Sequence, residues 1–154
     1  MFLPFSTDLI VTNHFDPEMA ALADRHYSRR TIGARQFMYS GKKIVIRNAE
    51  GTILFGWIFP DPTMRMDGQT GINCSIFRNE SKRLSSEVIL ECERIAIAKW
   101  GGQRMYTYIH PAKLRIVKRR GVEFCCWPPG RCFIEAGWRF ERLAKNGKHL
   151  LVKY

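Results

Sequence analysis

A base, a phenol and a hydroxyl follow one another at His26, Tyr27 and Ser28, where a helix is expected to end. Near neutral pH a histidine accepts or donates a proton, and a tyrosine donates a hydrogen bond to a developing oxyanion. These three residues are therefore candidate catalytic groups. The alternative is structural: His26 favours the helix dipole and Tyr27 packs against the core.

A second group joins an expected strand to the helix that follows it. Arg78, Asn79 and Glu80 stand at the strand end, where a guanidinium, an amide and a carboxylate together can orient a polar substrate and move a proton. Ser85 and Ser86 precede the helix; one of them is expected to cap it, and the other lies near a helix N-terminus, where anions collect. The structural alternative for Arg78, Asn79 and Glu80 is a solvated loop with an ordinary ion pair. For the two serines it is that they only cap the helix.

The third group is Tyr108 and His110, near the end of another expected strand. Alternate residues of a strand point to the same face of the sheet, so these two share a face and Thr107 points to the other. His110 is a candidate base if that face borders a pocket. The alternative is a surface histidine.

Basic residues gather in the C-terminal half. The chain has a formal net charge of +11, with eight basic and seven acidic side chains in residues 1–77 but seventeen and seven in residues 78–154. This distribution predicts a polyanionic partner: DNA, as a duplex with an extruded base or as a single strand. The alternative is a solubilising surface. The candidate contacts are Arg29, Arg30, Lys113, Arg115, Lys118, Arg119 and Arg120.

Length and composition restrict the class of protein. A chain of 154 residues with 45% hydrophobic content is expected to form one domain, residues 1–154. No apolar run approaches the roughly 20 residues that span a bilayer, and no secretory signal is recognisable, so we expect a cytoplasmic protein without membrane contact. The five cysteines are expected to be free thiols. Their spacing does not fit a zinc motif, so no metal site is predicted.

The hydrophobic pattern predicts a mixed α/β or α+β fold, with one central sheet covered by helices. A helix is expected to begin with Asp16 and Pro17 and to end within residues 27–30. A longer helix is expected from Ser85 or Ser86 to Gly101, and a third from Pro128 or Pro129 to Gly137. Strands are expected at 36–39, 43–47, 52–59, 71–78, 104–109, 138–143 and 149–154, with an irregular basic segment, containing at most one short helix, at 112–127.

This element order resembles the GNAT acyltransferase fold. Three stretches further resemble phage and prophage proteins related to the Mom DNA-modification family: His26-Tyr27-Ser28-Arg29; Phe77-Arg78-Asn79-Glu80 with Arg83-Leu84-Ser85-Ser86-Glu87; and Gly130-Arg131-Cys132-Phe133 with Ala136-Gly137-Trp138. The resemblance covers roughly residues 20–154. It implies a mostly antiparallel sheet whose fourth and fifth strands splay apart, with ligands entering that gap. It also implies a transferase that adds a carbamoylmethyl or acyl-type group to the exocyclic amine of a DNA base, with adenine the expected base, in a bacterial cell that carries a phage.

Two departures from the family pattern stand in the sequence. GNAT enzymes hold the pyrophosphate of acetyl-CoA on a glycine-rich loop before the central helix, but residues 79–86 contain no glycine, so acetyl-CoA is a doubtful cofactor and the donor is unknown. His110 stands where relatives carry an aspartate, so no carboxylate role is carried over to it. Two other functions stay open: an acetyl-CoA-dependent N-acetyltransferase of a small amine, protein or aminated base, and a non-catalytic nucleic-acid-binding protein.

Overall fold

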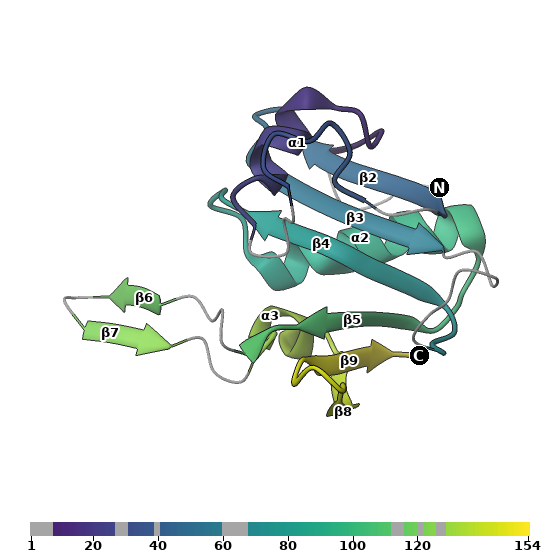
Figure 1. Ribbon diagram of the computed structural model, residues 1–154, viewed down its shortest axis with the longest axis vertical. Helices are drawn as coiled ribbons and strands as arrows, with labels where there is room; N and C mark the ends of the chain where they lie inside the picture. Colours follow the sequence, from purple (N-terminus) through teal and green to yellow (C-terminus); the bar gives the residue numbers. More distant parts are fainter. Residues whose placement is uncertain are drawn as a thin grey trace.

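The computed structural model describes residues 8–26, 31–38, 41–59, 68–111, 116–119, 122–125 and 129–154, with the backbone alone for residues 116–119 and 122–125. Within these ranges the fold is mixed α+β (Figure 1). The helices are α1 (Pro17–Ala23), α2 (Ser85–Trp100) and α3 (Arg131–Glu135). The strands are β1 (Leu9–Thr12), β2 (Lys42–Asn48), β3 (Ile53–Phe59), β4 (Ile72–Asn79), β5 (Met105–Ile109), β6 (Ile116–Arg119), β7 (Val122–Cys125), β8 (Arg139–Leu143) and β9 (His149–Lys153).

One seven-stranded sheet forms the centre of the described structure, in the order β1-β2-β3-β4-β5-β9-β8. Its neighbouring strands are antiparallel except β4 and β5, which run parallel. The ladder of that parallel pair consists of Ile72 opposite Met105 and Asn73 opposite Tyr106. Beyond these two pairs the strands diverge toward their carboxyl ends, as Figure 1 shows. The sheet therefore opens between β4 and β5.

An irregularity in β4 accompanies this opening. Gly56 of β3 lies opposite Ile76, whereas its neighbour Trp57 lies opposite Cys74, so Ser75 is an extra residue on β4. A bulge bends its strand and increases the local twist. This bend accounts for the way β4 leaves β5 after the first ladder pairs.

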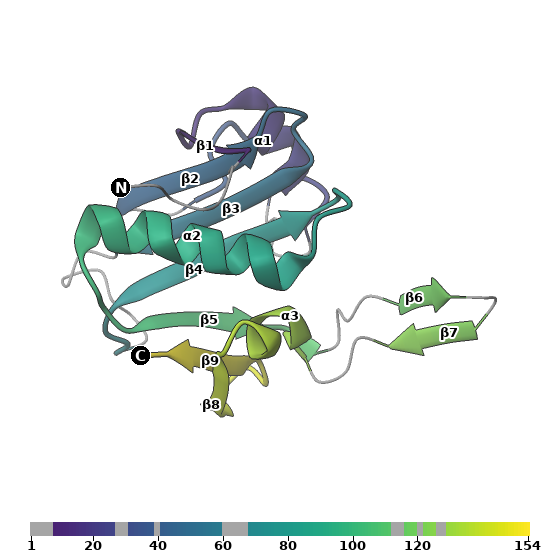
Figure 2. The ribbon, with the colours of Figure 1, turned by 180° about the vertical axis from the view of Figure 1, so that it is seen from behind.

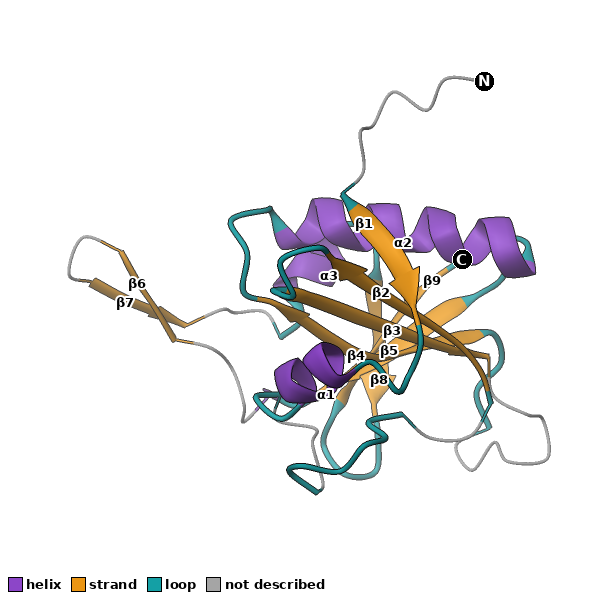
Figure 3. Cartoon of the chain, turned by 90° about the horizontal axis from the view of Figure 1, so that it is seen from above, coloured by secondary structure: helices purple, strands orange, loops and turns teal. Residues whose placement is uncertain are grey.

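Two layers of apolar side chains cover the two faces of the sheet. On one face α2 and α3 pack over a core that includes Phe55, Trp57 and Val88 (Figure 2). The Trp57 indole also donates a hydrogen bond of 2.9 Å to the carbonyl of Cys92 in α2. On the opposite face α1 packs over a smaller core (Figure 3), which includes Met19. Because successive side chains of a strand point to opposite faces, the continuously buried strands β2 and β3 supply both cores and hold all three helices in place.

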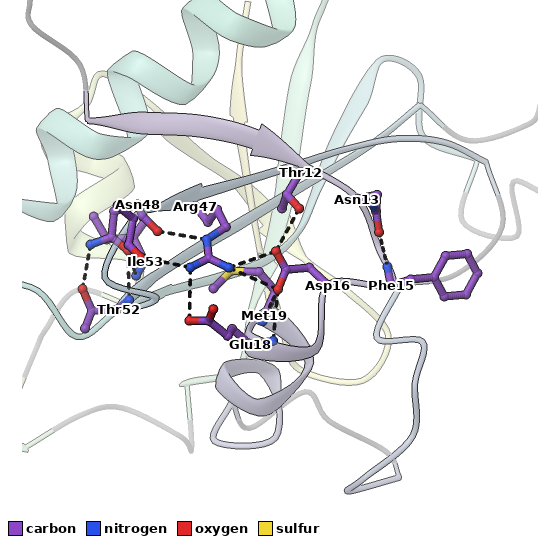
Figure 4. A network of polar contacts seen from close by, with 11 residues as sticks. Thr12, Asn13, Phe15, Asp16, Glu18, Met19, Arg47, Asn48, Thr52 and Ile53 are labelled. Carbon is purple, nitrogen blue, oxygen red and sulfur yellow. Dashed lines mark hydrogen bonds and ion pairs between the residues drawn. The ribbon is translucent and has the colours of Figure 1, made fainter.

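A buried guanidinium fixes α1 against the hairpin of β2 and β3 (Figure 4). Arg47 donates through Nη1 to the Asp16 carboxylate at 3.0 and 3.2 Å and through Nη2 to Glu18 at 3.1 Å. It also donates to the carbonyls of Asn48 at 2.9 Å and Ala49 at 3.1 Å. Only 8% of Arg47 is exposed, so these contacts replace the water that the charge has lost.

The start of α1 is confirmed. Asp16 caps the helix by accepting hydrogen bonds from the backbone N–H groups of Glu18 and Met19, and Pro17 is the first helical residue. The predicted end was wrong, because α1 stops at Ala23, several residues before His26. The chain leaves the helix there through i→i−3 hydrogen bonds to Leu22 and Ala23, which tighten the last turn.

The predicted strands agree with the structure in some places and differ from it in others. The strands predicted at 43–47 and 52–59 are confirmed as β2 and β3, joined by a turn in which the Gly51 N–H bonds to the Asn48 carbonyl. The strands predicted at 138–143 and 149–154 are confirmed as β8 and β9, which pair as a hairpin. The strand predicted at 36–39 was wrong: residues 36–38 have no strand pairing, although Phe37 and Met38 pack beneath α1. The segment 112–127 is not simply irregular, since it contains the hairpin of β6 and β7. Strand β1 carried no prediction.

No helix among the described residues is both long enough and apolar enough to cross a membrane. The buried Cys74 and Cys92 are free thiols, as expected.

Candidate functional site

Two arginines clamp one carboxylate where α1 meets the end of β4. Arg25 donates from Nε and Nη2 to the two oxygens of Glu80, at 2.9 and 3.0 Å. Arg78 donates from Nε to the same carboxylate and from Nη1 to the carbonyl of Arg25 at 2.6 Å. Hydrogen bonds from Arg25 and Arg78 lower the pKa of Glu80 to about 2. The three side chains therefore form one hydrogen-bonded unit with one excess positive charge.

His26 lies next to this unit. Its imidazole is half-buried, and its pKa is lowered from 6.5 to about 4. Loss of water is the largest cause and the charge of Arg78 the second, while a hydrogen bond to the Phe77 backbone acts in the opposite direction. At neutral pH the imidazole is consequently uncharged, with a nitrogen lone pair that can accept a proton. Of the residues predicted for catalysis, the fold brings His26, Arg78 and Glu80 together.

Asn79 organises the loop that leads from β4 to α2. Its amide nitrogen donates to the carbonyl of Arg83 at 2.8 Å and to the hydroxyl of Ser85 at 3.0 Å. Its amide oxygen accepts from the N–H of Ser81 at 2.9 Å. The Ser81 hydroxyl in turn accepts from the Arg83 N–H at 3.1 Å, and Arg83 pairs with Glu91 of α2. Asn79 therefore has a structural role in this loop.

The prediction that Ser85 or Ser86 caps α2 was wrong. The N-cap position is Leu84, which has no side-chain cap, and the two serines are the first two helical residues. Ser85 instead accepts from Asn79, and Ser86 is 8% exposed. The hydrogen bonds of Asn79 hold the loop at the helix entrance, and the N–H groups of Glu87 and Val88 bond to the Leu84 carbonyl at 3.1 and 3.2 Å.

Tyr108 and His110 lie on the other side of the opening, at the end of β5. Tyr108 packs edge-on against Tyr106 in a small cluster with Leu150. Thr107 belongs to the opposite face, as predicted, and its hydroxyl donates to the carbonyl of Cys74 at 2.9 Å. This bond joins β5 to β4 just past their last ladder pair. His110 is half-buried, directly after the last residue of β5.

Several predicted residues lie outside the described part of the chain. These are Tyr27 and Ser28 of the catalytic group, and Arg29, Arg30, Lys113, Arg115 and Arg120 of the nucleic-acid group. Lys118 and Arg119 are described by their backbone alone, in β6.

Sequence reasoning missed Arg25. Arg25 precedes the predicted His26, but its partner Glu80 is 55 residues away. Only the packing of α1 against β4 brings them together, so no local pattern could have identified the pair.

A separate cavity of about 350 Å³ lies near the start of β5. It is lined by Glu93, Ile97, Gln103, Arg104, Lys153 and Tyr154, among others. The ammonium of Lys153 holds Glu93 at 2.8 Å. None of the predicted site residues lines this cavity. Within the described residues no group of three or more His, Cys, Asp or Glu side chains is placed to hold a metal ion.

The environment of His26 predicts a measurable titration. By NMR, the His26 imidazole is expected to titrate near pH 4 instead of 6.5, with His26→Gln identifying its signal. Because the folded-state pKa is lowered, the stability that His26 contributes is fully present above pH 6.5. It is lost as the pH falls from 6.5 toward 4. A midpoint near 6.5 in the folded protein would contradict the desolvated environment.

Comparison with family models, curated proteins and solved structures found no match.

Proposed function

We propose that this protein is a GNAT-like transferase that modifies the exocyclic amine of a DNA base, in the manner of the Mom family that its motifs resemble. The observation that carries the proposal is the opening of the parallel pair β4 and β5 after two ladder pairs. At the carboxyl end of β4 this opening is bordered by Arg78 and Glu80, with His26 beside them. His110 borders it at the end of β5.

The charges of this region suit a nucleic-acid substrate. The unit of Arg25, Glu80 and Arg78 has one excess positive charge, and most of the net charge of the chain lies in residues 78–154. A polyanion is attracted to such a surface, with an affinity that falls as salt rises. A base inside a duplex must leave the stack before an enzyme can reach its amine, and adenine is the expected target.

The reaction requires a proton acceptor beside the amine. The amine nitrogen forms a bond to the activated carbon of the donor, the bond from that carbon to its leaving group breaks, and the nitrogen loses a proton. His26 is uncharged at neutral pH and is one candidate acceptor; His110 is the other. Arg78 is a positioning residue, because both its Nε and its Nη1 already hold protein oxygens.

The loop before α2 bears on the alternative of an acetyl-CoA-dependent enzyme. Three of its N–H groups already have acceptors inside the protein: Glu80 bonds to Thr52, Ser81 to Asn79 and Arg83 to the Ser81 hydroxyl. A pyrophosphate needs such donors unoccupied. Acetyl-CoA is therefore expected to leave the melting temperature unchanged. A concentration-dependent rise would favour the acetyltransferase, since a ligand that binds the folded state stabilises it.

Mass spectrometry of nucleosides tests the proposal. The protein is expressed with a plasmid in a bacterial host, the plasmid DNA is digested, and its nucleosides are compared with those from an empty vector. We expect a deoxyadenosine of increased mass, reduced at least about tenfold by the His26→Gln or the His110→Gln variant. His14→Gln, which changes a histidine at the other end of α1, is the matched control and should leave the yield unchanged.

An unmodified nucleoside profile from folded protein would overturn the proposal. If that protein still bound DNA with a steep salt dependence, the non-catalytic binding protein would be the better description. If the histidine variants gave the same yield as the wild type, the protein would still modify DNA. Neither His26 nor His110 would then be its proton acceptor.

A further inference from the structure

The hairpin of β6 and β7 stands apart from the rest of the described structure. Its strands pair with each other, from Ile116 opposite Cys125 to Arg119 opposite Val122, and form a two-stranded sheet of their own. All three ribbon views show it projecting beyond the carboxyl end of β5 (Figures 1, 2 and 3). The chain enters this ribbon after Pro111 and leaves it before Pro129. The ribbon is therefore rooted beside the opening between β4 and β5.

Such an arrangement needs a partner for its stability. An isolated two-stranded ribbon is marginally stable in water, because no second layer covers either of its faces. The sequence of β6 and β7 nevertheless has strong strand formers, such as Ile116, Val117 and Phe124. A ribbon of this kind becomes well ordered when it lies against another surface.

The charge of the ribbon indicates what kind of surface it binds. Residues 112–128 contain five basic side chains and a single acidic one, Glu123. Two copies of so basic a segment repel each other, which disfavours a second copy of this chain as the partner. A polyanion is attracted to it, and the ladder puts Lys118 and Arg119 at the end of β6 nearest the hairpin turn.

The dimensions of the ribbon agree with those of duplex DNA. Paired strands lie roughly 5 Å apart, and the major groove of B-DNA is about 12 Å wide and admits a two-stranded ribbon with its side chains. The minor groove, at about 6 Å, is too narrow for it. A single strand offers no groove at all.

We propose that the hairpin of β6 and β7 enters the major groove of duplex DNA and holds the duplex beside the opening between β4 and β5. This inference rests on the proposed function in taking the polyanion to be DNA. It goes further in naming the duplex as the substrate and the ribbon as the element that grips it.

Binding measurements test the ribbon separately from the chemistry. The double variant Lys118→Gln/Arg119→Gln removes two charges from β6, and Lys145→Gln/Lys148→Gln removes two charges from the turn between β8 and β9 as a matched control. The affinity of each protein for a 20-base-pair duplex, and for one of its strands alone, is measured by fluorescence anisotropy over a series of salt concentrations. Thermal unfolding checks that both variants are folded.

We expect the β6 variant to bind the duplex at least about tenfold more weakly, with a salt slope smaller by about two charges, while the control stays near wild type. The wild type should prefer the duplex to the single strand. Methyl green, which occupies the major groove, should displace the protein, and netropsin, which occupies the minor groove, should not. Equal losses in the two variants, displacement by netropsin alone, or no preference for the duplex would each overturn the inference.

The two proposals fail in different ways. Unmodified nucleosides together with ribbon-dependent duplex binding would overturn the transferase and leave the ribbon standing. Modified nucleosides together with normal duplex binding by the β6 variant would support the transferase and overturn the role of the ribbon. If sedimentation showed the wild type to be a dimer and the β6 variant a monomer, with equal DNA affinities, the partner of the ribbon would be a second copy of the chain.

Discussion

Replacing Arg47 with leucine is expected to lower the free energy of unfolding by about 3–5 kcal/mol, the usual cost of removing one partner from a buried ion pair. The substitution deletes the hydrogen bonds that Arg47 donates to Asp16, Glu18, Asn48 and Ala49 in the network of Figure 4. The Asp16 carboxylate, whose side chain is 11% exposed, is left with the Thr12 hydroxyl and two backbone N–H groups. Urea denaturation at pH 7 measures the loss.

The pH dependence of the same variant identifies the cause. Burial alone would raise the pKa of Asp16, but hydrogen bonds from Arg47 and Thr12 outweigh it and the pKa lies below 3.8. The stability that comes from this lowered pKa is present above that value and is lost as the pH falls below it. The difference between wild type and Arg47→Leu should therefore shrink in acid.

Lys42→Leu is the matched control, because it removes a positive charge from an exposed position of the same strand. Its cost should stay within about 0.5 kcal/mol, as for most surface substitutions. The double-mutant cycle of Arg47→Leu with Asp16→Asn should give a coupling energy above about 1 kcal/mol. Additive effects would mean that Arg47 stabilises the fold through its backbone contacts and not through Asp16.

The elements that the sequence predicts well have their determinants close together in the chain. Asp16 and Pro17 begin α1, Gly101 ends α2, and the turn around Gly147 joins β8 to β9, and each acts within a few residues. Strand β1 lacks such signals, because it lies at a sheet edge with Ile10 and Val11 more than half exposed.

The candidate site was harder to predict, since its geometry depends on contacts between distant segments. His26 and Glu80 were identifiable as chemically capable residues, but the clamp that joins α1 to β4 depends on Arg25. Ser85 and Ser86 have the composition of a cap, yet Leu84 occupies the N-cap position and the Ser85 hydroxyl accepts from Asn79. The bulge at Ser75, which bends β4 away from β5, has no sequence signal of its own.

Gly71→Ala is expected to cost at least about 3 kcal/mol of unfolding free energy, from backbone strain and steric overlap together. Gly71 has a φ of +99°, and a methyl group there would overlap the carbonyl oxygen of Arg104 and lie 2.7 Å from its carbon. That carbonyl accepts the N–H of Ile72 at 2.8 Å, directly before the two ladder pairs that join β4 to β5. Relief of the overlap must separate the strands at the one place where they pair, and urea denaturation measures the cost.

Gly101→Ala separates the two contributions. Gly101 has a φ of +79° and a ψ of 173°, a conformation that is essentially restricted to glycine, but a methyl group there would meet no atom within 4 Å. This variant therefore bears the backbone strain alone, at about 1–3 kcal/mol. Hydrogen exchange gives a local readout: the amide of Ile72 should lose protection in Gly71→Ala and keep it in Gly101→Ala. Equal costs in the two variants would mean that the Arg104 carbonyl moves freely. The opening between β4 and β5 would then not depend on a fixed junction at their first residues.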